Sequence, residues 1–560
     1  MEIMKIFFSK IKLPTSLSDG CYLTQDNIGS NYSSPWDDYG YVITFKCHIV
    51  KDGKQESLGH VKILTKDETN TANVFTSVSA EPIVEITDVL NPEKFISLSS
   101  DLDYYRKIRK IFDQIEEVEK FLQLICDASF YYQLQDAFRN WGGFSSGILR
   151  SGSASEAAIK KGHQIAIGNY EIQENFTFTI KNLPDSFDPI TLSFDNIENN
   201  INSRRINVLV GENGVGKSHA LLALVRNITG IDKTGESLPF FHKIICIAYS
   251  PFEKFYTKNG IATALYEMHI GPIKKDSKTK KERRRLNVNA YAYIGFKKED
   301  GEFALNWPAT HSVMSLLKLI SYDAENRWWR GKSKFDQLFD ALSRHIEFDA
   351  IGLKEKTGTF AYINKENYDS AKLKIDQLDS SHGVSFFFKE TEVNLSSGQN
   401  IYAYMLPSLM AEIEDESLVL IDEPELYLHP TLEIALLDML KTILSVTKSY
   451  AVLATHSPVM VREVDKEAVS ILRKREGRTT VFRPPFQTLG ESTDRISGEV
   501  FDDYYTNKPF QKTVDNLIRD EQISINEIEK ISAHVGDEAL AYAITILSDS
   551  DNLEVEIGDL

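Results

Sequence analysis

Apolar and polar positions alternate along the chain in short blocks that predict a mixed α/β protein. Nearly continuous apolar runs at 206–210, 244–248, 418–422 and 450–455 have the length and composition of strands buried on both faces of a parallel sheet. Between the last two runs, apolar residues recur at helical spacing at Leu432, Ala435, Leu436, Met439, Leu440 and Ile443. A strand, a helix and a strand of this length form a right-handed crossover, so these two runs are predicted to lie parallel in one sheet.

The first third of the chain predicts an α+β region. Residues 41–45 and 59–64 flank a turn at 51–53, which is typical of a β-hairpin, and a helical pattern runs from about 103 to 138. Glycine and serine dominate residues 142–153, which is typical of a loop at a domain boundary.

Two further regions surround the apolar runs. Strands at about 171–180 and 190–195 lead into the run at 206–210, and they could equally form the first sheet of the following core, with part of the N-terminal region folded onto it. The long stretch between 218 and 395 carries amphipathic helices but no sustained heptads, with apolar spacing at Phe335, Leu338, Phe339, Leu342 and Ile346. The chain after about 485 ends in short acidic helices.

Composition fits a chain with a large core and argues against several classes of protein. The chain has 560 residues, of which 42% are hydrophobic, yet no apolar run approaches the length of a membrane span. The first residues lack the architecture of a signal peptide, so a cytoplasmic location is expected. The net charge of -18 argues against a protein that coats nucleic acid with its whole surface. Buried free thiols and no zinc site are expected from four scattered cysteines, Cys21, Cys47, Cys126 and Cys246.

The pattern of a phosphate-binding loop follows the run at 206–210. Residues 211–218 read GENGVGKS, which is G-x-x-x-x-G-K-S, and a helical stretch follows. In such a loop the glycines let backbone N–H groups face the phosphates, Lys217 reaches the outer phosphates and the Ser218 hydroxyl ligates Mg²⁺. The predicted nucleotide-binding residues of this loop are Gly211, Asn213, Gly214, Gly216, Lys217, Ser218 and His219.

Two other apolar runs end in residues suited to ATP hydrolysis. Asp422 is expected to hold Mg²⁺ directly or through water, and Glu423 to orient and deprotonate the attacking water. The crossover predicted above brings His456 to the same sheet edge as Glu423 and Lys217, where it would sense the terminal phosphate. The plainer alternatives are an acidic turn after a buried strand and an ordinary surface or core histidine.

Together these motifs resemble the soluble branch of the ATP-binding cassette (ABC) superfamily, which includes SMC, Rad50 and RecF proteins and the overcoming-lysogenisation-defect ATPases. Residues 395–399, LSSGQ, resemble the LSGGQ signature with Ser397 in place of its first glycine, and residues 424–430, PELYLHP, resemble the EPE-x-x-LHP turn of that branch. The resemblance implies that the signature of one subunit caps the nucleotide held by another, through Ser396, Gly398 and Gln399.

The implied fold is an α/β ABC-ATPase head, with a mixed β-sheet, a phosphate-binding core and a helical lobe. We expect an N-terminal α+β region at 1–165 packing on the head, and an ATPase core at 166–490 with a helical lobe inserted at about 230–393. A C-terminal helical partner-binding region is expected at 491–560. The chain has no room for the long coiled coil of an SMC or Rad50 protein, and its C-terminal part lacks the Glu and Asp-x-Asp pattern of a Toprim nuclease.

One family element is missing. After the strand at 244–248 the family usually offers a glutamine to the metal and the water, whereas this chain reads Tyr-Ser-Pro-Phe-Glu. Ser250 and Glu253 are the possible substitutes. The aromatic residue that would stack on adenine is unassigned.

Two basic segments are candidates for local contact with nucleic acid. Residues 274–285 carry eight cations in twelve positions and no apolar residue, which suits either a phosphate-binding loop or a mobile solvated insertion. Residues 327–334 interleave two tryptophans with arginine and lysine, which suits stacking on unpaired bases. Paired tryptophans are also common in cores and protein interfaces.

A narrower resemblance is to the PtuA ATPases of Septu anti-phage systems, including those encoded beside retrons. It rests on the hairpin end at 58–64, on residues 95–105 and on residues 490–501. It implies a cytoplasmic oligomer of head-to-tail dimers that binds an HNH nuclease and, in retron operons, a reverse transcriptase with its RNA and single-stranded DNA. The ATPase would hold the nuclease inactive until infection disturbs the assembly.

The sequence therefore predicts an ATPase that binds ATP and Mg²⁺ at composite sites between two copies and whose nucleotide state controls a separate effector. The alternative is a DNA-repair ATPase of the RecF kind that acts directly on DNA. A scaffold with a decayed site is disfavoured, because Lys217, Ser218, Asp422, Glu423 and His456 are all present.

Overall fold

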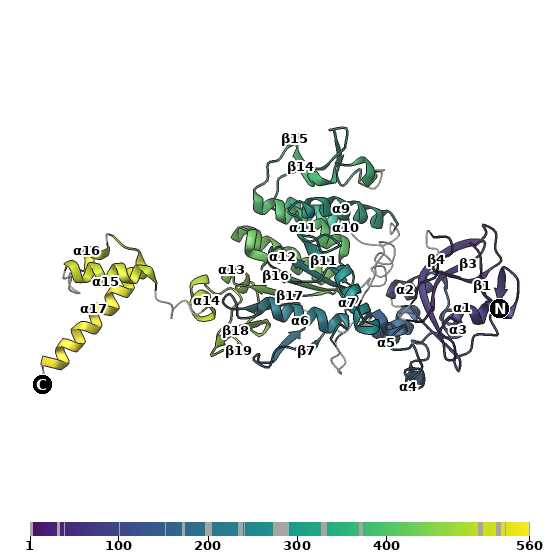
Figure 1. Ribbon diagram of the computed structural model, residues 1–560. Coiled ribbons are helices and arrows are strands. Elements are labelled where there is room, and N and C mark those ends of the chain that lie inside the picture. Colours follow the sequence, from purple (N-terminus) through teal and green to yellow (C-terminus); the bar gives the residue numbers. More distant parts are fainter. Residues whose placement is uncertain are drawn as a thin grey trace. The chain divides into compact units, whose positions relative to one another are not determined.

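The four predicted buried strands lie side by side at the centre of a seven-stranded sheet (Figure 1). These strands are β9 (Ile206–Val210), β10 (Ile244–Ala248), β16 (Leu418–Asp422) and β17 (Tyr450–Thr455), and each is buried along its whole length. The sheet is completed by β11 (Tyr291–Gly295), β18 (Val469–Arg475) and β19 (Arg478–Phe482), in the order β11-β10-β16-β17-β9-β18-β19. Its neighbours are parallel except for the β18–β19 pair.

This computed structural model describes residues 4–30, 34–37, 40–99, 101–151, 153–170, 174–195, 204–232, 239, 241–272, 291–325, 333–368, 373–501, 508–521, 528–532 and 534–558. The chain divides into two compact units, Met1–Glu491 and Ser492–Leu560. The basic run at 274–285 and most of the second basic segment lie outside the described residues, so both interpretations stay predictions.

The crossover between β16 and β17 has the predicted form. Helix α12 (Pro430–Val446) connects the two strands, which pair in parallel with Asp422 opposite Ala454. The six apolar residues predicted to line its inner face are all buried. Helix α6 (Lys217–Thr229) follows the loop after β9 and buries apolar residues such as Leu221 and Leu224 against residues of the central strands. The predicted ABC-ATPase head fold, α/β with a mixed sheet, is confirmed.

The N-terminal region folds around a six-stranded sheet of its own. Its strands are β1 (Ile6–Ser9), β2 (Gly20–Gln25), β3 (Thr44–Lys51), β4 (Lys54–Thr65), β5 (Ile83–Glu85) and β6 (Phe95–Leu98), in the order β5-β1-β2-β3-β4-β6. The predicted hairpin is confirmed as β3 and β4, which are longer than predicted. The accompanying helices are α1 (Thr71–Val78), α2 (Leu102–Ile111), α3 (Ile115–Leu124), α4 (Gln135–Phe138) and α5 (Ser153–Ile167).

Two N-terminal predictions differ from the structure. The helical pattern at 103–138 is broken into α2, α3 and α4, because Phe112 turns to extended backbone and Cys126 adopts a left-handed φ of 57°. The segment at 142–153 is not a domain boundary, since Phe144 and Ile148 are buried in the N-terminal core. The four cysteines are buried free thiols, as predicted.

The stretch between α6 and the signature is only partly helical. Its helices include α7 (Lys258–Ile270), α9 (Trp307–Glu325) and α10 (Lys334–Ser343). On α10, Phe335, Leu338 and Leu342 are buried, whereas Phe339 is half-buried and Ile346 lies beyond the end of the helix. A four-stranded antiparallel sheet that the sequence did not predict contains β12 (Ala350–Lys354), β13 (Phe360–Ile363), β14 (Val384–Phe388) and β15 (Thr391–Glu392). Strands β10 and β11 also fall within this stretch but belong to the central sheet.

The remaining elements are a β-hairpin before the phosphate-binding loop and the helices of the second unit. The predicted strands before the phosphate-binding loop are confirmed as the hairpin β7 (Phe176–Ile180) and β8 (Ile190–Phe194). The second unit is helical, with α14 (Thr493–Val500), α15 (Pro509–Glu521), α16 (Ile528–Ser532) and α17 (Asp537–Gly558). Across the described residues no helix is both long enough and apolar enough to cross a membrane.

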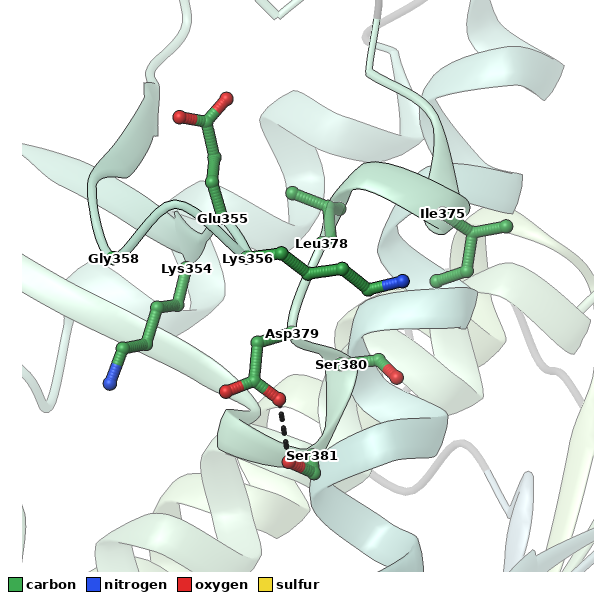
Figure 2. Close-up of a pocket in the computed structure, with 9 residues that line it drawn as sticks. All are labelled: Lys354, Glu355, Lys356, Gly358, Ile375, Leu378, Asp379, Ser380 and Ser381. Carbon is green, nitrogen blue, oxygen red and sulfur yellow. Dashed lines mark hydrogen bonds between the residues drawn. The ribbon is translucent and has the colours of Figure 1, made fainter.

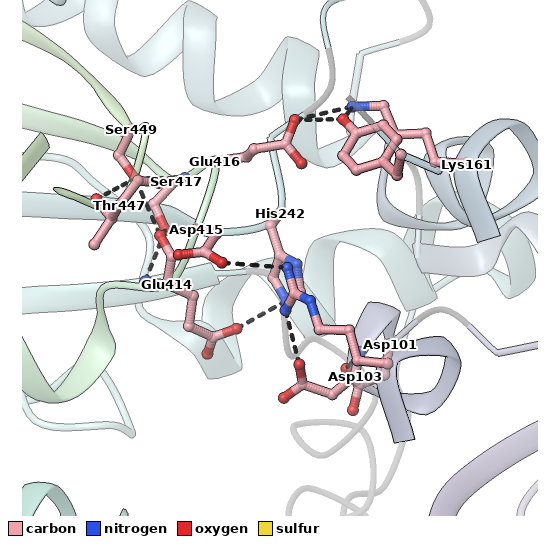
Figure 3. A network of polar contacts seen from close by, with 12 residues as sticks. Asp101, Asp103, Lys161, His242, Glu414, Asp415, Glu416, Ser417, Thr447 and Ser449 are labelled. Carbon is pink, nitrogen blue, oxygen red and sulfur yellow. Dashed lines mark hydrogen bonds and ion pairs between the residues drawn. The ribbon is translucent and has the colours of Figure 1, made fainter. Parts of the chain in front are cut away.

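A polar network joins the N-terminal helices to the loop that precedes β16 (Figure 3). Lys161 on α5 and the Tyr170 hydroxyl contact the same carboxylate oxygen of Glu416, at 3.0 and 2.7 Å. On α2, Arg106 lies 3.6 Å from Asp415. The segment that leads into the Asp422-Glu423 strand is thus tied to the N-terminal region through charged groups.

A second charged cluster is centred on the buried Lys243. The Lys243 side chain is only 8% exposed and its ammonium lies 2.7 Å from Glu412 and 3.1 Å from Glu414. Burial alone would raise the pKa of Glu412, but the ammonium groups of Lys243 and Lys318 outweigh burial and lower the pKa to about 2. Because the folded-state pKa lies below the unfolded value, this carboxylate stabilises the fold above about pH 4.5, and its contribution is lost as the pH falls toward 2.

Replacing Lys243 with methionine is therefore expected to reduce the free energy of unfolding at pH 7 by about 2–3 kcal/mol, since Glu412 and Glu414 lose their shared ammonium and keep only Lys318 and His242. Urea unfolding of the parent and the variant measures this loss. The difference should shrink below pH 4.5, where the carboxylates of the variant take up protons. Lys298→Met, which removes an exposed ion pair with Glu302, is the control and should change little. Equal urea midpoints for Lys243→Met and the parent at pH 7 would contradict the prediction.

Candidate nucleotide-binding site

The phosphate-binding loop runs from the end of β9 to the start of α6. Gly216 caps the helix with a left-handed φ of 103°, and a Cβ at this position would lie 2.2 Å from the Phe187 ring. A Cβ on Gly211 would lie 2.2 Å from the Leu472 carbonyl oxygen. Both glycines are required for close approach, and the loop presents the N-terminus of α6 to an anion.

Lys217 lies within this loop rather than in solvent. Its ammonium donates to the carbonyl oxygens of Gly211, at 2.7 Å, and Glu212, at 3.1 Å, and the residue is 5% exposed. Burial lowers the pKa of Lys217, although the carboxylates of Glu423 and Asp422 oppose that shift. Bound anionic phosphates would stabilise the positive charge of the Lys217 ammonium, which burial disfavours.

Ser218 and Asp422 meet across the site. The Ser218 hydroxyl donates to Asp422 Oδ1 at 2.9 Å, and Asp422 is 4% exposed. Burial, with a contribution from Glu423, raises the pKa of Asp422 to about 7. A buried carboxylate beside a hydroxyl is a set of oxygen donors that fits Mg²⁺, whose charge would favour the ionised carboxylate. These two residues would hold Mg²⁺, as the sequence suggested.

Glu423 follows β16 in a conformation that non-glycine residues rarely adopt. Its φ is 49°, and its amide donates to the Ala454 carbonyl oxygen on β17 at 2.9 Å. Such backbone strain is concentrated at functional sites, where the surrounding structure holds it in place. The contact fixes the end of β16 to β17.

Strand register places His456 at the same edge. Asp422 pairs with Ala454, and Thr455 pairs with Val210, so Glu423, His456 and Gly211 follow three neighbouring strand ends. The His456 side chain is 37% exposed. The structure thus brings together the loop, the two carboxylates and the histidine that the sequence selected.

The signature residues lie at the start of α11 (Ser397–Glu412). Ser396 caps the helix in a reciprocal arrangement, accepting from the Gln399 amide while the Gln399 side chain accepts from the Ser396 amide. Gly398 packs closely on the turn after Glu423, since a Cβ there would lie 2.5 Å from the Tyr427 carbonyl oxygen. Ser396 and Ser397 are exposed, so the helix N-terminus is open to another molecule.

The structure corrects one expected substitute for the missing glutamine. The Glu253 side chain is 2% exposed, and it binds Lys297 at 2.7 Å, the Tyr293 hydroxyl at 2.9 Å and the Phe255 amide at 2.6 Å. These partners occupy the carboxylate, so Glu253 is not available to a metal. Ser250 remains the candidate at this position.

Two residues that support the loop were not found from the sequence. The buried Thr479 hydroxyl on β19 donates to the Val215 carbonyl oxygen at 3.0 Å. The Phe187 ring covers Gly216 and lies 6.0 Å from the His219 ring, so Phe187 is a candidate for stacking on a base. No motif marks either residue, because both support the loop through contacts that form only in the folded chain.

A separate pocket of about 420 Å³ lies on the β12–β15 sheet (Figure 2). It is lined by Lys354, Glu355, Lys356, Gly358, Ile375, Leu378, Asp379, Ser380 and Ser381. Only Leu378 of these residues is buried. The pocket includes none of the residues of the phosphate-binding loop, and its polar side chains are not held for a specific ligand.

Comparisons with known proteins relate parts of the chain to an ATPase family and to two other proteins. Residues 279–462, which include the signature, Asp422, Glu423 and His456, match the family described as "AAA domain, putative AbiEii toxin, Type IV TA system". Over this segment the chain is thus similar to an ATPase domain. It is also 25% identical over 506 residues to Protein ea59 of Escherichia phage lambda, with 88% of this chain and 90% of that protein covered.

Among solved structures, the chain is similar to an SMC head bound to the C-terminal winged-helix domain of ScpA. That likeness has a TM-score of 0.27 and 14% identity, and it covers 53% of this chain and 92% of the SMC head chain. The descriptions of these relatives name no Septu system, retron, HNH nuclease or reverse transcriptase, so the narrower resemblance to PtuA stays a prediction.

Proposed function

We propose that two copies of this chain bind ATP between them and hydrolyse it, and that the nucleotide state controls a separate effector protein. The observation that carries the proposal is the gathering of Lys217, Ser218, Asp422, Glu423 and His456 at one sheet edge. The exposed, capped signature at Ser396 would bind the terminal phosphate held by the second copy.

The residues of this edge divide the work of hydrolysis. Glu423 takes the proton of a water molecule as the water oxygen attacks the γ-phosphorus, and the bond from that phosphorus to the β–γ bridging oxygen breaks, releasing ADP and phosphate. Lys217 and the N-terminus of α6 offset the phosphate charge. Mg²⁺, when bound, would neutralise charge on the β- and γ-phosphates from its place at Ser218 and Asp422.

ATP acts in this scheme as a bridge between two subunits. A ligand shifts an equilibrium only by its differential affinity for the two states, and ATP gains contacts with Ser396 of the second copy only in the closed dimer. Hydrolysis removes the terminal phosphate and with it the preference for closure. The network between Glu416 and the N-terminal helices gives such a change a physical route to the N-terminal region.

The finer part of the proposal concerns the effector. The resemblance to PtuA supports an HNH nuclease as the partner, in a Septu or retron-associated anti-phage complex, with a reverse transcriptase and its RNA and single-stranded DNA in the retron case. The ATP-controlled effector is the primary proposal, and host defence is its narrower setting.

Co-purification with the products of neighbouring genes tests the effector. Parent, Lys217→Ala and Glu423→Gln chains are each expressed with an adjacent nuclease frame. A stable complex is expected, with nuclease activity that differs by about tenfold or more between the two variants, since they favour opposite states. The RecF-like alternative is supported instead if no complex forms and DNA alone stimulates ATP hydrolysis.

A further inference from the structure

One carboxylate beside the hydrolysis residues has no role in the scheme above. Glu425 lies in the 3-10 turn after Glu423 (Pro424–Tyr427), and its side chain is only 9% exposed. Its Oε1 atom accepts from the His456 backbone amide at 2.7 Å and lies 3.4 Å from His456 Nε2. A single oxygen of Glu425 therefore contacts both the backbone and the imidazole of His456.

Two atoms of this pair are buried without a partner. The second carboxylate oxygen of Glu425, Oε2, and the imidazole Nδ1 of His456 make no hydrogen bond within the described part of the chain. Buried polar atoms are nearly always paired, and an unpaired one costs free energy. The pair therefore has unused hydrogen-bonding capacity next to the catalytic base.

A second carboxylate holds the segment that follows His456 at the end of β17. The Ser457 hydroxyl donates to Glu433, in the first turn of α12, and caps the short helix α13 (Pro458–Val461) by accepting from the Met460 amide. The carboxylates of Glu425 and Glu433 therefore both fix the residues that follow β17. Of these two carboxylates, Glu425 is the one whose described contacts include the imidazole, and its Oε2 atom is buried without a hydrogen bond.

We propose that Glu425 is a positioning residue of the hydrolysis site. Its Oε1 atom fixes His456 relative to Glu423, and its buried Oε2 atom accepts a hydrogen bond from an ordered water molecule that enters with the nucleotide. This inference rests on the proposed ATP hydrolysis at Glu423. Glu425 acts through His456 and that water, so its loss misaligns the attack while the phosphate-binding loop still holds ATP.

Steady-state ATP hydrolysis by Glu425→Gln tests the proposal, because glutamine keeps the shape but replaces one acceptor oxygen with a donor. We expect kcat to fall by about 10- to 100-fold, as for other groups that orient active-site residues, while KM changes by less than about threefold. Glu425→Asp, which keeps both acceptor oxygens, should recover part of the loss. Glu302→Gln, at an exposed position, serves as the control.

A double-mutant cycle measures whether Glu425 and His456 act together on kcat, which a purely structural role of Glu425 would not produce. If Glu425 works through His456, Glu425→Gln combined with His456→Ala should be no slower than His456→Ala alone. Additive losses would overturn the proposal, as would a raised KM with parental kcat. Thermal melting of each variant identifies a folding defect, and Glu425→Asp then gives the decisive comparison.

The outcomes separate this inference from the proposed function. If Glu423→Gln loses activity while Glu425→Gln keeps the parental kcat, the role of Glu425 is wrong and the proposed hydrolysis stands. If Glu423→Gln and Glu425→Gln both hydrolyse ATP at the parental rate, the proposed site itself is wrong.

Discussion

Replacing Glu423 with glutamine is expected to lower the rate of ATP hydrolysis by about 100- to 10,000-fold while leaving Mg²⁺ and ATP bound. Glutamine has the shape of glutamate and still contacts water, but it cannot accept the proton of the attacking water. The Glu423 amide remains bonded to Ala454, so the backbone keeps its position. Single-turnover hydrolysis and equilibrium binding of labelled ATP measure the two effects separately.

Glu476 provides a matched control for this variant. It shares the left-handed backbone of Glu423, with a φ of 49° at both residues, but lies exposed in the β18–β19 turn. Glu476→Gln should hydrolyse ATP at the parental rate. If Glu423→Gln also did so, Glu423 would not be the base.

Replacing Lys217 with alanine is expected to weaken ATP binding by about 3 kcal/mol, or roughly 100-fold, since it removes charge-assisted hydrogen bonds to the phosphates. Alanine favours helix, so α6 should still begin after Gly216. Isothermal titration with Mg²⁺ and a non-cleavable ATP analogue measures the loss. Lys54→Ala, exposed in the N-terminal hairpin, should bind as the parent does. If Lys217→Ala bound the ATP analogue with the affinity of the parent, the loop would not be part of the nucleotide-binding site.

The central sheet could be predicted from the sequence because its strands are buried on both faces. Such strands read as continuous apolar runs, and the runs at 206–210, 244–248 and 450–455 match β9, β10 and β17 residue for residue. The phosphate-binding loop and the Asp422-Glu423 pair lie next to these runs in the sequence. Their approach to one another follows from the rules for parallel crossovers.

The sheet of the inserted region was missed for the opposite reason. Strands β12 to β15 are short, and β13 and β15 carry half-buried or exposed residues with no clear alternation. Only β14, with VSFFF, reads plainly as a strand. The helical spacing elsewhere in the same stretch, which corresponds to α10, favoured the prediction of a helical lobe.

Long-range polar contacts were also beyond the reach of sequence patterns. The sequence offered Glu253 as a substitute for the missing glutamine, but in the folded chain its carboxylate contacts Lys297 and Tyr293, some forty residues away. Glu425 was noticed only as part of a turn motif. Nothing in its spacing indicated that its carboxylate would lie on the amide of His456.

Sedimentation velocity of Glu423→Gln, with and without Mg²⁺ and ATP, measures whether ATP joins two chains of 63.6 kDa. We predict that ATP doubles the mass of the sedimenting species for this variant. Lys217→Ala and Ser396→Ala, which each remove one side of the bridge, should show no such change. If Glu423→Gln sediments with the same mass at high concentration whether or not ATP is present, the composite site is contradicted.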